Sequence, residues 1–183
     1  RLAVCEHHAE RFAPAAELLE RFLASYAEHA LAASARYYCG DSLSRLGRHE
    51  QAVRQFTEIV KNHKSDPVFA PTLLRLGDSL AALQRWAPGE QTFTTFLDKF
   101  PDSQQAYQAH FGRAWAVENQ GRFDEAAKGY ERVLVGHSGP TAARAQFQIG
   151  QCLFAQKKYE DAARELLRVD ILYAYPEWSA AAL

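Results

Sequence analysis

The chain has 183 residues, of which 48% are hydrophobic and 23% are charged, a balance that supplies enough apolar surface for a buried core. Lys and Arg number 21 against 22 Asp and Glu, so the formal net charge is −1, and no strong positive field exists to attract a nucleic acid. No apolar run approaches the roughly 20 residues that a membrane helix needs. We therefore expect no nucleic-acid partner and no membrane span within this sequence.

Apolar residues recur along the chain with the spacing of amphipathic helices, and Gly and Pro residues separate one helix from the next. The pattern predicts helix pairs and no strands. Ser103 and Thr141 are candidates to cap the helices that follow them. We expect the first helix of each pair at 1–10, 31–46, 68–83, 103–119 and 140–156, and the second at 12–26, 49–63, 86–99, 123–137 and 159–173.

A small residue recurs at one position in the first helices, at Gly40, Gly77, Ala114 and Gly150, in steps of 37, 37 and 36 residues. The second helix carries another small residue twelve positions later, followed by large apolar residues after four and seven further positions. This spacing places the three residues on one helix face, where small residues let two helix axes approach closely. The columns are Ala52, Gly89, Ala126 and Ala162; Phe56, Phe93, Tyr130 and Leu166; and Ile59, Phe96, Val133 and Val169.

The repeat resembles the tetratricopeptide repeat (TPR), whose skeleton reads W-x2-L-G-x2-Y…A-x3-F…P. No unit has Trp at the first skeleton position, the third unit has Arg113 and Ala114 where Leu and Gly are usual, and the period exceeds the usual 34 residues. The longer repeats, with their FPDS and YPEW junctions, resemble bacterial Tol-Pal-associated and outer-membrane-assembly TPR proteins. The clearest unit carries Leu73, Leu76, Gly77, Leu80, Gly89, Phe93 and Pro101.

The resemblance implies an all-α fold, a right-handed α-solenoid of antiparallel helix pairs. Residues 1–183 would form a single TPR solenoid segment of a longer protein, so the absence of a signal peptide carries no weight. The compartment stays open, with a bacterial periplasm or cell envelope favoured over the cytoplasm. We expect a partial repeat at 1–30, repeats at 31–67, 68–103, 104–140 and 141–176, and the start of a further repeat at 177–183.

No constellation of residues indicates catalysis, a cofactor or a metal. The P-loop, G-x-S-x-G and H-E-x-x-H motifs are absent, and only Cys5 and His8 share a helix face, whereas zinc takes three or four ligands. His63 and His137 occupy equivalent positions in the last turn of two second helices, where a cation complements the helix dipole. The cysteines, Cys5, Cys39 and Cys152, form no C-x-x-C pair and are interpreted as small apolar packing residues.

The first helices line the concave groove of TPR arrays, so the resemblance assigns a partner-binding groove to positions flanking the small-residue column. Trp115 stands where other units have Asp or Gln, which favours exposure. Phe111, Phe147 and Phe154 are also compatible with core positions between helices. The predicted groove residues are Tyr37, Asp41, Arg45, Leu74, Asp78, Phe111, Trp115, Glu118, Arg144, Phe147, Gln151 and Phe154.

The leading hypothesis is a scaffold for protein–protein interaction that binds a partner protein or peptide in this groove. The Lys and Asn clamp with which some TPR co-chaperones hold a terminal carboxylate is missing, so a segment with apolar anchors and a Lys or Arg fits better. One alternative is a structural spacer, or a segment that self-associates through the solenoid ends, in a larger cell-envelope assembly. Another is an enzyme whose catalytic domain lies outside this sequence.

Overall fold

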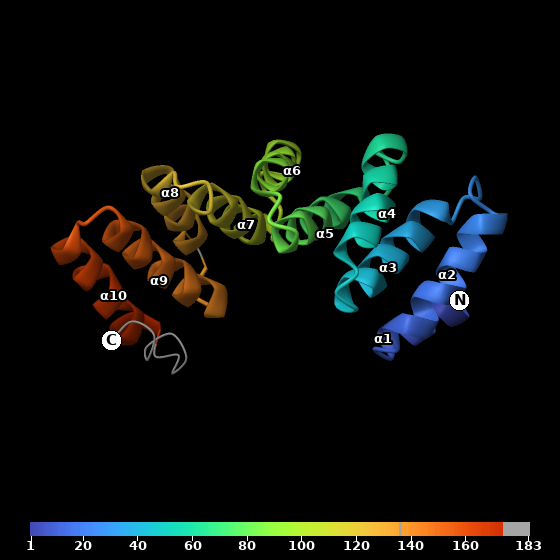
Figure 1. The fold of residues 1–183 in the computed structure, drawn as a ribbon, viewed down its shortest axis with the longest axis horizontal. Helices are drawn as coiled ribbons and strands as arrows, with labels where there is room; N and C mark the ends of the chain where they lie inside the picture. The colour runs from blue at the N-terminus through green and yellow to red at the C-terminus, as the bar shows by residue number, and fades with distance from the viewer. Residues whose placement is uncertain (136, 174–183) are drawn as a thin grey trace. The chain divides into compact units, whose positions relative to one another are not determined.

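A computed structural model describes residues 1–135 and 137–173 of the chain, and these residues form helices and no strand (Figure 1). Each helix boundary lies within three residues of its predicted position. The predicted start of a further repeat at 177–183 lies outside the described residues. The helices are α1 (Leu2–His8), α2 (Phe12–Ser25), α3 (Ala32–Arg45), α4 (His49–Asn62), α5 (Phe69–Ala82), α6 (Trp86–Lys99), α7 (Ala106–Glu118), α8 (Phe123–Leu134), α9 (Pro140–Ala155) and α10 (Tyr159–Tyr173).

The chain divides into two compact units, Arg1–Arg85 with α1 to α5 and Trp86–Leu183 with α6 to α10. Within each unit, helices that are consecutive in the sequence pack against one another. In the first unit α1 pairs with α2 and α3 with α4, and in the second unit α7 pairs with α8 and α9 with α10. The odd-numbered helices are the predicted first helices, and they keep that name below.

The turn that joins the two helices of a pair repeats at the same register along the chain. Gly47 and Gly121 have φ angles of 73° and 77° in this turn, and glycine adopts such left-handed angles without steric cost. Glu10, Gln84 and Lys157 adopt the same conformation, with φ of 58°, 57° and 63°, at a cost of about 1 kcal/mol each. Repetition of the left-handed residue independently supports the period found in the sequence.

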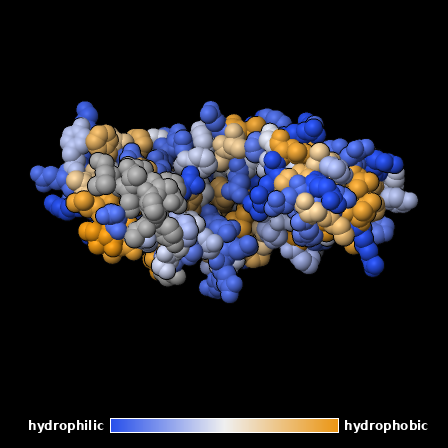
Figure 2. Space-filling model, turned by 90° about the horizontal axis from the view of Figure 1, so that it is seen from below, coloured by the Kyte–Doolittle hydropathy of each residue, from blue (hydrophilic) through white to orange (hydrophobic). Residues whose placement is uncertain are grey.

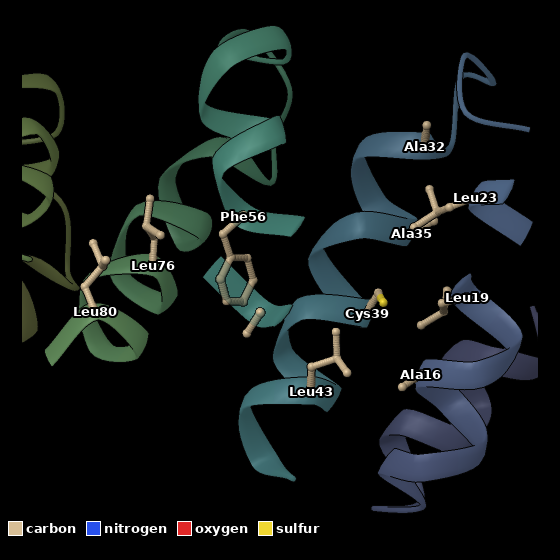
Figure 3. Packing of buried hydrophobic residues seen from close by; sticks show 11 residues of the cluster. Ala16, Leu19, Leu23, Ala32, Ala35, Cys39, Leu43, Phe56, Leu76 and Leu80 are labelled. Carbon is tan, nitrogen blue, oxygen red and sulfur yellow. The ribbon is translucent and has the colours of Figure 1, made fainter. Parts of the chain in front are cut away.

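The core of the first unit depends on a close approach between α3 and α4. Phe56 of α4 is fully buried, and a Cβ atom placed on Gly40 of α3 would lie 2.6 Å from the Phe56 ring. In Figure 3 the side chains of Leu19 and Cys39 point toward one another from α2 and α3, and the Phe56 ring lies between α3 and α5. The predicted contact of the small residue with the large one is therefore confirmed in this repeat.

The second unit uses the same contact in its last helix pair. A Cβ atom on Gly150 of α9 would lie 2.6 Å from the side chain of Leu166 on α10. The pair α7–α8 differs, because Ala114 replaces glycine in the first helix and Gly129 of α8 makes the room instead. A Cβ atom on Gly129 would lie 2.9 Å from the Cβ atom of Ala114. In this pair the smaller of the two contacting residues therefore lies on the second helix and not on the first.

Three local predictions are wrong. Helix α7 has Gln105 at its N-cap, and the Ser103 hydroxyl accepts a hydrogen bond from the Gln105 N–H within the preceding turn, at 3.2 Å. Helix α9 begins at Pro140 after Gly139, which leaves Thr141 inside its first turn, since proline is preorganised for the first helical position. Cys5 is exposed and is not a packing residue.

The other two cysteines are packing residues as predicted. Cys39 and Cys152 are fully buried. Burial raises the pKa of both thiols to about 12, so they remain protonated at neutral pH and have little nucleophilic character.

The substitution Gly40→Ala tests the helix contact in the first unit. The added methyl group must displace the buried Phe56 ring, and overpacking of this kind costs more than the helix propensity that alanine gains. We expect the free energy of unfolding, measured by urea denaturation, to fall by about 1 to 2 kcal/mol. The double substitution with Phe56→Leu should lose less than the two single losses added together; strict additivity would contradict the proposed contact.

Candidate functional site

The candidate site consists of two groups of side chains, one in each unit. A polar ladder in the first unit comprises His7, Asp41, Arg75 and Asp78, which come from α1, α3 and α5. An aromatic–arginine cluster in the second unit comprises Phe111, Trp115 and Arg144, which come from α7 and α9. Both groups are carried by first helices.

Asp41 lies at the centre of the polar ladder and is only 6% exposed. Its Oδ1 atom is 3.0 Å from Nε of Arg75, and its Oδ2 atom is 3.4 Å from Nε2 of His7. Nη1 of Arg75 lies 3.7 Å from Oδ2 of Asp78. Because a buried carboxylate requires charged or hydrogen-bonded partners, Asp41 links three successive first helices.

The electrostatics of the ladder differ between its two ends. Burial lowers the pKa of His7 although the Asp41 carboxylate opposes the shift, which favours a neutral imidazole at neutral pH. Nδ1 of this ring lies 2.9 Å from the Ser42 hydroxyl. At the other end, burial raises the pKa of Asp78 to about 6 while Arg75 opposes the shift, and solvent reduces this effect because the Asp78 side chain is 57% exposed.

The predicted groove residues of the first unit separate by exposure. Asp78 and Arg45 are exposed and Tyr37 is half-buried; the guanidinium carbon of Arg45 lies 5.9 Å from the centroid of the Phe12 ring. Asp41 and Leu74 are each 6% exposed. These two side chains offer almost no surface to a partner, and Asp41 instead contacts Arg75 and His7 within the ladder.

The aromatic–arginine cluster joins α7 to α9. The guanidinium carbon of Arg144 lies 4.7 Å from the centroid of the Phe111 ring and 5.8 Å from that of Trp115. A cation near aromatic faces at these distances is attracted by the ring quadrupoles. Trp115 also meets Trp86 of α6 edge to face, with the ring centroids 5.5 Å apart. The half-buried Trp115 ring therefore contacts both Trp86 and Arg144.

Glu118, a further predicted groove residue, is bound to the core of the second unit. Its Oε2 atom accepts hydrogen bonds from the hydroxyl of Tyr130 at 2.6 Å and from Nε2 of Gln148 at 2.9 Å. Tyr130 is fully buried, and this burial raises the pKa of its hydroxyl, with the Glu118 charge as a second cause. The carboxylate of Glu118 thus satisfies a buried hydroxyl that lacks access to water.

The remaining groove residues lie on α9. Phe147 and Gln151 are half-buried, whereas Phe154 is 57% exposed and packs edge to face on Tyr159, with the centroids 5.3 Å apart. Of the three aromatic residues for which a core position was the alternative, Phe111 is buried at 8% exposure and Phe154 is not. Phe154 and Tyr159 form an exposed aromatic pair across the turn between α9 and α10.

Several partners were not predicted, namely His7, Arg75, Trp86 and Gln148. His7 has the register of Ser44 in the next first helix, and Arg75 directly follows the predicted residue Leu74. Their roles depend on contacts between neighbouring helices, which the spacing within one helix does not reveal.

The described residues provide neither a metal cluster nor a membrane-spanning helix. No three His, Cys, Asp or Glu side chains among residues 1–135 and 137–173 lie close enough to hold a metal ion. None of the described helices combines the length and the hydropathy needed to span a bilayer.

Asp41 and Asp78 occupy the same register position in successive repeats and form a matched pair for mutation. Asp41→Asn removes the buried charge that pairs with Arg75 and faces His7, so we expect the free energy of unfolding at pH 7 to fall by about 1 to 3 kcal/mol. Asp78→Asn should leave the free energy of unfolding nearly unchanged or slightly higher. The raised pKa of Asp78 means that its charged form is less favourable in the folded protein than in the unfolded chain. Equal losses in urea denaturation would contradict the assignment of Asp41 as the centre of the ladder.

Comparison with known proteins extends the description of the fold. Similar solved structures include MamA from Desulfovibrio magneticus RS-1, with a TM-score of 0.80 and 13% identity over 93% of this chain and 90% of that chain. MamA of MSR-1 has a TM-score of 0.76 and 16% identity over 93% and 91%, and MamA of AMB-1 has 0.74 and 16% over 93% and 94%. At these identities the likeness shows the fold alone. A search of curated proteins found no match.

A family profile gives the stronger assignment. The profile described as Tetratricopeptide repeat matches residues 2–67, 74–142 and 119–176. The TPR fold supports a role as a scaffold for protein interaction in general and implies protein partners. The narrower likeness to Tol-Pal-associated proteins stays a prediction. Since the profile matches most of the sequence and the structure is an all-α arrangement of helix pairs, the chain belongs to the tetratricopeptide repeat family.

Proposed function

We propose that this chain is a non-enzymatic module that binds segments of a partner protein on the faces of its first helices. The observation that supports the proposal most directly is the aromatic–arginine cluster, in which Trp115 contacts both Trp86 and Arg144. Trp and Arg are enriched among the residues that dominate binding energy at protein interfaces. A ring that is already held in place loses little conformational freedom when a partner binds.

The second unit suits an apolar or aromatic anchor. Trp115 is half-buried and Phe154 is 57% exposed, so each presents aromatic surface that a partner side chain can cover. Arg144 lies over Phe111 and Trp115 and adds a positive charge at this surface. A partner segment with a large apolar residue next to an acidic or polar group has the complementary chemistry.

The first unit suits a cationic side chain. The Asp78 carboxylate is exposed at the end of the polar ladder, and a single distant contact of 3.7 Å joins it to Arg75. A Lys or Arg of the partner would supply a closer counterion and would lower the raised pKa of Asp78. The balanced net charge of −1 does not favour a nucleic acid as the partner.

Selection of linear peptides from a displayed random library tests this proposal without knowledge of the natural partner. Peptides selected on the intact chain should bind about tenfold or more weakly when the chain carries Trp115→Ala or Asp78→Lys. Lys128→Ala, which changes an exposed residue of the second helix α8, is the control and should leave affinity unchanged. Thermal melts of each variant separate lost binding from lost folding. If folded Trp115→Ala and Asp78→Lys proteins bind all selected peptides as the parent does, the proposal fails.

A second candidate function, self-association, is favoured by exposed apolar side chains on α10. Leu167, Ile171 and Leu172 are 53%, 75% and 63% exposed, and Leu2 and Leu31 of the first unit are 63% and 59% exposed. Figure 2 shows apolar areas over each unit within a surface that is otherwise mostly hydrophilic. Exposed apolar patches commonly mark surfaces that bind other proteins, and a second copy of the chain is one such partner.

Light scattering coupled to size exclusion tests self-association. If the α10 surface joins copies of the chain, the mass should rise above the monomer mass of 20.6 kDa with increasing concentration. The double substitution Ile171→Ser and Leu172→Ser should return it to the monomer value. A monomer at every concentration would exclude this candidate and would leave the first proposal untouched.

A further inference from the structure

A hollow of about 490 Å³, lined by polar and apolar side chains, lies in the second unit, where the loop before α7 meets the C-terminal end of α8. It contains none of the predicted groove residues. Three of its side chains are positively charged or become so on protonation, three carry hydroxyl or amide donors, and no Asp or Glu is among its described lining residues. The polar members are His110, Arg132, His137, Ser103, Gln104 and Tyr107.

The three side chains differ in their contacts, and Arg132 is exposed. The rings of His137 and Tyr107 stack with centroids 4.0 Å apart and an interplanar angle of 18°. Arg132 forms no ion pair or hydrogen bond with any described residue, whereas Arg122 at the other end of α8 pairs with Glu90 and Glu125. Burial lowers the pKa of His110, and the charges of Arg132 and Arg113 lower it further, as expected for a locally positive potential.

The other repeats fill the three basic positions differently. In the second repeat, residues 68–103, all three equivalent positions hold uncharged residues. In the first repeat, residues 31–67, the acidic residue Glu58 replaces the arginine. In the fourth repeat, the arginine donates to Glu165 at 2.7 Å. The grouping of one arginine with two histidines therefore belongs to the third repeat and not to the repeat pattern. In chain order the sets are Arg36, Glu58 and His63; Leu73, Thr95 and Phe100; His110, Arg132 and His137; Gln146, Arg168 and Tyr173.

We propose that this hollow, defined by Arg132, His110 and His137, binds a phosphate group, either as the free anion or as the ester on a serine side chain. A guanidinium group donates paired hydrogen bonds that match the spacing of phosphate oxygens. The imidazole rings supply N–H donors, and Ser103 and Gln104 add uncharged donors in the same hollow. A doubly charged tetrahedral anion uses more of these donors than a carboxylate does. The site thus adds an anion-binding function to the protein-binding role.

The test uses NMR spectroscopy of the intact chain, with the ring signals of the histidines as reporters, in a buffer free of phosphate and at constant ionic strength. Inorganic phosphate, O-phosphoserine and acetate are titrated separately. The signals of His110 and His137 should shift to saturation with the first two probes and not with acetate at the same concentrations. The tighter of the two phosphate probes identifies the free anion or the ester as the source.

Two variants and a control complete the test. Arg132→Gln should weaken phosphate binding by about tenfold or more, because it removes a charge-assisted donor pair, and His137→Gln should weaken it less. Arg54→Gln, which changes an exposed arginine of α4 in the first unit, should have no effect. The proposal would be overturned by shifts that never saturate or by acetate binding equal to phosphate binding. It would also be overturned if Arg132→Gln and Arg54→Gln bound phosphate with equal affinity.

Discussion

The structure depends on the close approach of two helices at a position where one of them has almost no side chain. Gly40 leaves room for the Phe56 ring, Gly150 for Leu166, and Gly129 for Ala114. A methyl group at any of these glycines would come within 3 Å of its neighbour, so the contact permits little sliding or rotation of one helix against the other. The contact thereby determines which residues of a first helix face its partner helix and which remain available for other contacts.

That constraint explains why side chains of different chemistry appear at one register in different repeats. The position after the small residue holds Asp41, Asp78 and Trp115 in three successive first helices. In the first unit its members lie along the polar ladder, where a buried carboxylate organises the charges. In the second unit Trp115 joins an arginine and a second tryptophan. The packing contact is repeated, whereas the side chain beside it, buried at Asp41 and exposed at Asp78, differs from repeat to repeat.

The sequence predicted what depends on the repeat spacing, and it missed the polar contacts between first helices of neighbouring repeats. The bounds of the ten described helices, each within three residues, and the contact of Gly40 with Phe56 followed from the spacing of small and large residues. The burial of Asp41 did not, because it requires His7 and Arg75 from neighbouring helices, and neither has a distinctive spacing. Cys5 was placed in the core by its register, but its neighbourhood lacks the helix packing that covers Cys39 and Cys152.

The most direct test of the account is amide hydrogen exchange, measured on the chain alone and with a selected peptide bound. Local protection reports which helices a ligand stabilises. The account predicts that the peptide slows exchange in first helices, in α3 and α5 or in α7 and α9, while the second helices α4 and α8 change little. Protection confined to α4 or α8, with the first helices unaffected, would contradict the claim that the first-helix faces bind the partner.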